Sequence, residues 1–213
     1  MLIEKDNKNV VSKANVYEII WCKSKGGIMN HIDPSKTMQQ CIAGLMGLDK
    51  YRFLLEQVHK VDVSSDEIFQ RTFNGFYMVR RNKGWRKAFY DLFERVKISN
   101  DVSFAYILEE LYRLTGNVEA SFSSKLLATL KPQMPIWDRY VVQNLNLKQP
   151  SDSDPKRIQK AKGLYGEIVN WYKDFLLTDN ARQCIDEFDK VLPDYSWLSD
   201  VKKIDFYLWS IRS

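Results

Sequence analysis

The chain has 213 residues, a net charge of +5 and an aromatic content of 13%, including six Trp. A chain of this length buries enough apolar surface to fold without disulfides or metals, and its three cysteines form no CxxC pair, which excludes zinc-finger and cysteine-held iron–sulfur sites. Neither GxxxxGKS/T nor GxGxxG occurs, which excludes nucleotide-phosphate chemistry of those two kinds.

The sequence offers little material for a metal centre or a membrane span. Its two histidines, His31 and His59, have no cysteine or paired carboxylate neighbours at ligand spacing. No apolar run approaches the roughly 18 residues that a membrane span needs, and the N-terminal segment has no apolar core behind a basic start. We expect a cytoplasmic protein without a bound metal, whose cysteines are buried thiols.

Apolar residues recur mainly at three-and-four spacing along the chain, and alternating runs are almost absent. This pattern predicts an all-α fold, a compact multi-helix globule of about ten helices with little or no strand. Ser64 followed by Glu67 predicts a capping box before one of the helices. In chain order, helices are expected over residues 16–21, 34–48, 51–61, 68–81, 84–97, 102–114, 121–130, 138–147, 157–177, 181–192 and 201–211.

The domain organisation is less sharply marked. Polar and turn-forming residues cluster in "QPSDSDPKR", residues 149–157, which is the best linker candidate. No internal repeat or low-complexity tract is present. We expect a single compact helical domain over residues 1–213. The alternative is two lobes, one formed by 1–60 with 151–213 and the other by 61–150, the core that contains the helical hairpin described below.

Residues 79–97 hold seven basic and two acidic side chains, so the net charge of this segment equals that of the whole chain. A basic patch around Trp85 suits phosphates, with a base stacked on the indole. Basic side chains at a helix start oppose the helix dipole unless an anion binds there. The alternative is a solvated loop whose arginines pair with acidic neighbours. The basic residues nearest Trp85 are Arg80, Arg81, Lys83, Arg86 and Lys87.

A helical hairpin is expected near residues 104–130. Its first helix ends before Gly116, which stands where a helix C-cap is expected, and prolines end the second helix. Asp138 then stands at the N-cap of the next helix. Such a carboxylate has two interpretations: a cap worth about 1 kcal/mol, or a group that stabilises an oxocarbenium-like charge and orients an attacking water.

The run "LYRLTGNVEASFSSKLLATLKPQMPIWDRYVVQNL", residues 111–145, resembles the helix-hairpin-helix signature of the DNA base-excision glycosylases. The separation of 22 residues from Gly116 to Asp138 is similar to that of the family. The segments "RTFNGFYMVRRNKGW" and "PIWDRYV" also resemble an uncharacterised bacterial glycosylase-like family. The residues that match the signature are Leu114 and Gly116 in the hairpin and Pro135, Ile136, Asp138 and Val141 around the aspartate.

The chain also departs from the signature. Thr115 replaces the hairpin proline and Val118 replaces the second glycine. Bifunctional members of the family have a nucleophilic lysine where this chain has Glu119 and Ala120, and Lys125 lies about one and a half turns later. Lys125 is either a Schiff-base nucleophile or, as we expect from its position opposite the apolar face of its helix, a side chain that extends into water. The resemblance therefore implies base excision in which Asp138 activates water.

The resemblance further implies a DNA-repair protein that binds duplex DNA through the hairpin turn, Gly116, Asn117 and Val118, and through the basic loop, residues 80–87. In the family a monovalent cation can lie at this turn, and no other cofactor is expected. A glycosylase extrudes its target base, so aromatic wedge or stacking residues are needed. The alternatives are a non-catalytic helical DNA-binding module and a protein-interaction domain with a basic loop. The stacking candidates are Tyr77, Trp85, Trp137 and Tyr140.

Overall fold

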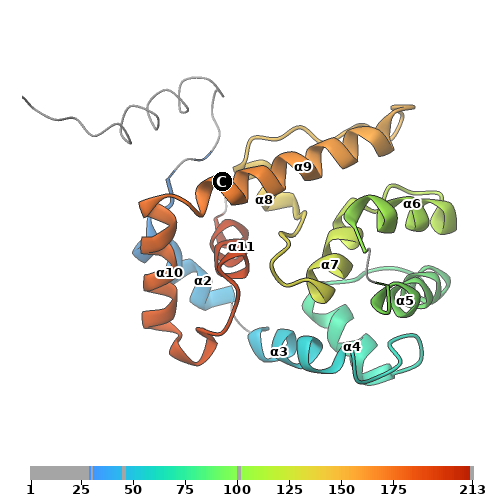
Figure 1. Ribbon diagram of the computed structural model, residues 1–213, viewed down its shortest axis with the longest axis horizontal. Helices are drawn as coiled ribbons and strands as arrows, with labels where there is room; N and C mark the ends of the chain where they lie inside the picture. Colours follow the sequence, from blue (N-terminus) through green and yellow to red (C-terminus); the bar gives the residue numbers. More distant parts are fainter. Residues whose placement is uncertain (1–28, 30, 45–46, 100–101, 212–213) are drawn as a thin grey trace, which may run out of the picture.

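The computed structural model describes residues 29, 31–44, 47–99 and 102–211. The helix expected over 16–21 and the thiol of Cys22 lie outside these ranges. The described residues form ten α-helices, one short 3₁₀ helix and no strand, so the all-α prediction is confirmed (Figure 1). The helices are α2 (Pro34–Gly44), α3 (Leu48–Gln57), α4 (Glu67–Phe76), α5 (Lys83–Lys97), α6 (Phe104–Thr115), α7 (Ala120–Leu130), α8 (Arg139–Asn144), α9 (Arg157–Phe175), α10 (Asp179–Val191), η1 (Pro193–Tyr195) and α11 (Asp200–Ser210).

The helices gather at two ends of the molecule with α7 and α8 between them (Figure 1). At one end α2, α10 and α11 pack against one another, and at the other α5 packs on α6. Helix α3 contacts α4 and α7, α6 contacts α7 and α9, and α8 contacts α11. One continuous apolar core runs through all of these contacts, and it includes the free, buried thiols of Cys41 and Cys184.

The predicted hairpin is formed by α6 and α7. Ser103 caps the start of α6, where its side chain accepts a hydrogen bond from the N–H of Tyr106. Gly116 ends α6 in the left-handed conformation, with φ of 73°, and its N–H donates to the carbonyl of Tyr112. This is the backbone state that glycine adopts without steric cost, which is why the helix ends where the sequence indicates.

Helix α4 differs from its prediction at both ends. The N-cap is Asp66, which accepts from the N–H of Phe69, whereas Ser64 bonds to the carboxylate of Asp62. The predicted Ser64–Glu67 capping box is therefore wrong, because the nearer aspartate takes the cap position.

The predicted helix over 68–81 ends early, at Phe76. Met78 adopts φ of 53°, and the N–H of Val79 donates to the carbonyl of Asn74, so the chain turns away from the helix axis. This is a Schellman-type end with methionine at the position that glycine usually occupies. The left-handed backbone costs about 1 kcal/mol or more for a residue with a Cβ atom. As a result, residues 77–82 form a loop that leads into α5.

We predict that Gly116→Ala lowers the free energy of unfolding by about 1 kcal/mol. An added Cβ would meet no atom within 4 Å, so the cost comes from the left-handed backbone alone. Gly163→Ala is the matched control, because its Cβ would also enter open space but within the interior of α9. There the change should stabilise the protein by up to about 1 kcal/mol. Urea denaturation measures both, and an unchanged midpoint for Gly116→Ala would contradict the left-handed assignment.

Candidate functional site

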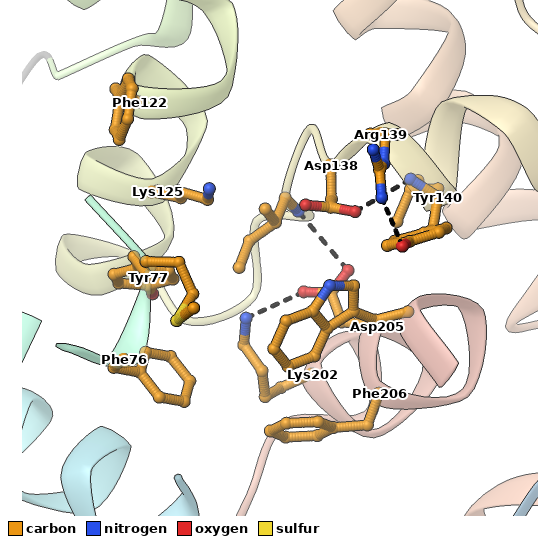
Figure 2. A pocket seen from close by; sticks show the side chains of 14 residues that line it. Phe76, Tyr77, Phe122, Lys125, Asp138, Arg139, Tyr140, Lys202, Asp205 and Phe206 are labelled. Carbon is orange, nitrogen blue, oxygen red and sulfur yellow. Dashed lines mark hydrogen bonds and ion pairs between the residues drawn. The ribbon is translucent and has the colours of Figure 1, made fainter. Parts of the chain in front are cut away.

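A pocket of about 400 Å³ opens between the end of α4, helix α7, the start of α8 and helix α11. Figure 2 shows that side chains from these four elements converge on one space. Aromatic rings form much of its wall, and charged groups are set among them. The rings are Phe76, Tyr77, Phe122, Tyr140, Phe206 and Trp209. The charged residues are Lys125, Asp138, Arg139, Lys202 and Asp205.

Asp138 is both a helix cap and a pocket residue. Its backbone is extended, and a carboxylate oxygen accepts a hydrogen bond of 2.9 Å from the N–H of Tyr140. The predicted cap is therefore confirmed. The side chain is half-buried and also lines the pocket. Because a carboxylate has two oxygens with about four acceptor positions, the cap leaves capacity for a ligand.

Lys125 also lines the pocket, on the side opposite Asp138 (Figure 2). Its Nζ lies 5.2 Å from the centroid of the Phe122 ring and 5.8 Å from that of Tyr77, and it has no hydrogen bond or ion pair within the described residues. Burial lowers the pKa of Lys125 below that of an ordinary lysine; Asp138 opposes the shift and Lys202 adds to it. The side chain is thus a partly desolvated amine facing a carboxylate across the pocket.

The expectation that Lys125 extends into water is therefore wrong. It assumed that α7 buries one face, formed by residues such as Leu126. In the structure Ser123, Ser124 and Thr129 are buried too, because α6 and α3 both pack on α7. A helix covered on several sides leaves its lysine facing a pocket and not bulk solvent.

Lys202 and Asp205 form a buried ion pair on α11, with 2.9 Å between Nζ and Oδ2. Asp205 also accepts from the hydroxyl of Tyr172 and from the N–H of Ile136. Burial raises the pKa of Asp205, although these donors act in the opposite direction. The sequence analysis did not predict this pair, because residues 201–211 have the apolar spacing of an ordinary amphipathic helix. The available signal was an aspartate directly beside Ile204, at a position that the apolar pattern assigns to the interior.

The basic loop is joined to the hairpin through Glu119. This carboxylate is buried and accepts from the guanidinium of Arg81 at 2.7 Å and from Nε1 of Trp85 at 3.0 Å. The Arg81 guanidinium also lies 5.3 Å from the centroid of Phe122, a ring of the pocket wall. Met78, at the start of the loop, lines the pocket. The predicted loop and hairpin are therefore in contact through Glu119, and Met78 and Phe122 line the same pocket as Asp138.

The remaining basic residues divide between the two interpretations made from the sequence. Lys87 pairs with Asp91, as a solvated helix face would. Arg80 and Lys83 are exposed and Arg86 is half-buried. At the hairpin, the N–H of Gly116 and that of Asn117 are already bonded, to Tyr112 and to the Thr115 hydroxyl. A phosphate at this turn would have to accept from the N–H of Val118 or replace one of those two hydrogen bonds.

Three of the four stacking candidates are core residues, among them Tyr77, which is 6% exposed. Trp85 is 8% exposed, and Trp137 is 4% exposed with its ring parallel to that of Phe104. Neither indole is available to enter a duplex. Tyr77 and Tyr140 line the pocket, where Tyr77 bonds to the hydroxyl of Thr129. The further pocket rings that sequence reasoning missed are Phe76, Phe122, Phe206 and Trp209.

In the described part of the chain, no group of three or more His, Cys, Asp or Glu is placed to hold a metal. Nor is any described helix long and apolar enough to cross a bilayer. Comparison of the chain with protein-family models, with curated proteins and with solved structures finds no match in any of the three. Inferences about function therefore start from the pocket.

We predict that Asp138→Asn lowers the pKa of Lys125 further, because it removes the nearby negative charge that favours the ammonium. Asparagine caps helices as well as aspartate does, so α8 should remain intact. The pKa can be followed by NMR after reductive ¹³C-methylation of the lysines, with Lys125→Arg to identify the signal. Asp66→Asn, at the N-cap of α4, is the control and should leave it unchanged. If the pKa of Lys125 in Asp138→Asn equalled or exceeded that in the unaltered protein, the electrostatic interaction between the two side chains across the pocket would be contradicted.

Proposed function

We propose that this protein is a DNA glycosylase-like enzyme that binds duplex DNA and releases a base held in the pocket. The observation that carries the proposal is the approach of Lys125 and Asp138 from opposite sides of one aromatic-lined space. Aromatic walls suit the faces of an extruded base. The two charged groups are of the kinds that act on a sugar carbon, a carboxylate and a partly desolvated amine.

Asp138 is suited to the charge that develops when an N-glycosidic bond breaks. The sugar acquires oxocarbenium-like positive charge, which a fixed carboxylate stabilises without having to reorganise. The bond to Tyr140 N–H holds Asp138 in place from one side and leaves acceptor capacity toward the pocket. The same carboxylate can orient a water molecule that attacks the sugar, which is base excision without strand cleavage.

The lowered pKa of Lys125 favours a second route. Desolvation increases the fraction of neutral amine at a given pH, and a neutral amine can attack C1′ directly. The base then leaves with the electron pair of the C1′–N bond, the bound amine loses a proton, and opening of the sugar ring at the C1′–O4′ bond gives a Schiff base that permits strand cleavage. Both routes use the same pocket and the same carboxylate, and they differ in the nucleophile.

The loop from Met78 onward suits the DNA side of this proposal. Arg80 and Lys83 are exposed, follow the pocket residue Met78 closely along the chain and can contact phosphates. Met78 is 58% exposed at the pocket wall and is held in a left-handed backbone. Because Trp85 and Trp137 are buried, Met78 takes their place as the candidate wedge, and methionine is among the apolar side chains that enter base steps.

We predict that Asp138→Asn reduces base release by about 100-fold or more and leaves duplex affinity nearly unchanged. The assay uses duplexes that each contain one damaged or modified base, with alkali treatment to reveal abasic sites. Asp66→Asn is the matched control, since it changes another capping aspartate away from the pocket. Full activity in Asp138→Asn would remove Asp138 from the mechanism, and no release from any duplex by the unaltered protein would favour a non-catalytic DNA-binding module.

Borohydride added during the same reactions distinguishes the two nucleophiles. It reduces a Schiff base to a stable protein–DNA adduct, which migrates slowly in a denaturing gel. An adduct that disappears in Lys125→Arg would assign the attack to Lys125. Base release without an adduct would assign it to water.

We predict that Arg80→Glu with Lys83→Glu weakens duplex binding at least tenfold at low salt and reduces the slope of log K against log salt by about 2, since about 0.9 is lost for each phosphate contact. Lys83 lies in the first turn of α5, where glutamate favours the helix dipole, so folding should not suffer. Lys36→Glu with Lys173→Glu is the charge-matched control, because both lysines are exposed, on α2 and α9, and neither lines the pocket. Equal loss in both double variants, or in neither, would favour the protein-interaction alternative. Electrophoretic mobility shifts over a salt series measure both.

A further inference from the structure

The Lys202–Asp205 ion pair has no part in the chemistry proposed for Lys125 and Asp138. Both residues line the pocket, yet Lys202 is 2% exposed and Asp205 is 6% exposed, whereas Asp138 is half-buried. The pair therefore belongs to the deep end of the pocket. Figure 2 shows it on α11, apart from Lys125 on the far wall.

Burying two charges is costly, and well-packed apolar residues are often at least as stabilising as a buried ion pair. A buried pair in a cleft is for that reason a candidate for binding or catalysis. The neighbouring Lys203–Asp189 pair, which joins α11 to α10, offers a comparison. Its Nζ and Oδ1 lie 2.6 Å apart, and neither residue lines the pocket.

The hydrogen-bonding capacity of the pocket pair is only partly used. An ammonium group has three donors, and in the described structure Asp205 is the single acceptor for Lys202, whose Nζ otherwise lies over the ring of Tyr51 at 5.0 Å. Asp205 accepts from Lys202, Tyr172 and Ile136, which leaves about one of its roughly four acceptor positions. Donor and acceptor capacity thus remain side by side at the deep end.

The walls restrict the shape of the ligand. Aromatic rings approach from α4 and α7 on one side and from α8 and α11 on the other, so a flat conjugated ring is favoured over a bulky aliphatic group. The volume of about 400 Å³ lies within the roughly 300–1,000 Å³ typical of small-molecule pockets. A planar heterocycle with an acceptor next to a donor on one edge satisfies both the walls and the pair.

We propose that Lys202 and Asp205 bind the edge of a lactam-type base, one with a ring carbonyl next to a ring N–H, in which Lys202 donates to the oxygen and Asp205 accepts from the N–H. This rests on the proposed function, because it names the class of base that the enzyme releases. The expected substrates are bases such as uracil and hypoxanthine, and amino bases such as cytosine and adenine are disfavoured.

An amidine edge also places an acceptor beside a donor. The chemistry of the leaving group favours the lactam over the amidine. When the C1′–N bond breaks, its electron pair stays on the base, and in a lactam the negative charge spreads onto the carbonyl oxygen. A lysine ammonium fixed beside that oxygen stabilises the charge as it forms. Water supplies the hydroxyl that adds to C1′ and the proton that neutralises the base. Adenine has no ring carbonyl to take up the charge, and the carbonyl of cytosine in a nucleotide has no ring N–H beside it to donate to Asp205.

The test uses free bases and needs neither DNA nor excision. Each base carries a methyl group on the nitrogen that would hold the sugar, so the matched probes are 9-methylhypoxanthine against 9-methyladenine and 1-methyluracil against 1-methylcytosine. Binding to the full chain is followed by NMR of ¹⁵N-Trp-labelled protein through the indole signal of Trp209, which lines the pocket and is identified with Trp209→Phe. We expect each lactam to bind at least about tenfold more tightly than its amino counterpart, since a site built for a hydrogen-bonding edge rejects analogues that mismatch it.

The matching variant is Lys202→Met with Asp205→Asn. The double change avoids leaving one buried charge unpaired, and asparagine retains an acceptor for Tyr172 and Ile136. It should abolish the lactam preference, whereas the control Lys203→Met with Asp189→Asn should retain it. Equal affinities within each pair of bases in the unaltered protein, no binding of either lactam up to its solubility, or a preference that survives the pocket double variant would each overturn the inference.

The measurement on the unaltered protein stands even if the pocket variant fails to fold. It also separates the inference from the proposed function. A lactam preference in a protein that neither binds DNA nor releases a base from it would leave the inference intact and remove the glycosylase proposal. Excision of bases from DNA by a protein without the lactam preference would support the glycosylase proposal and overturn the inference about Lys202 and Asp205.

Discussion

Desolvation of charge where α7, α8 and α11 meet is the constraint on which the site depends. Helices that cover α7 on several sides exclude water from the amine of Lys125, and the burial of α11 does the same for Lys202 and Asp205. Charges in such a place interact strongly because water does not screen them. The same burial that depresses the pKa of Lys125 gives Asp138 influence over it from the opposite wall.

Backbone geometry places the other components with few interactions. One hydrogen bond, from Tyr140 N–H to Asp138, both starts α8 and fixes the direction of a pocket carboxylate. At the end of α4, a left-handed methionine turns the chain so that Met78 faces the pocket and the basic residues follow beside it. Buried Glu119 then ties this loop to the hairpin through Arg81 and Trp85. The turn at Met78, the cap at Asp138 and the buried Glu119 therefore fix the position of the loop relative to the pocket.

The net charge of the chain is concentrated in the basic segment, but the fold uses its members differently. Arg81 neutralises a buried carboxylate and Lys87 pairs on the helix surface, so neither is available as a free charge. Arg80 and Lys83 remain exposed. Fewer basic side chains are thus free to meet a partner than the sequence count suggests.

The local features were accessible from the sequence because each depends on neighbouring residues. Helical periodicity, the glycine that ends α6 and the aspartate that starts α8 were all predicted from spacing and residue type. Burial around a whole helix is not a local property. The sequence by itself determined the all-α class, the hairpin and the cap at Asp138. Only the tertiary structure decided that Lys125 faces a pocket, that Trp85 and Trp137 are core residues, and that Lys202 and Asp205 are paired in the interior. The reason is that periodicity reports one buried face of a helix, whereas packing of distant helices determines how many faces are buried.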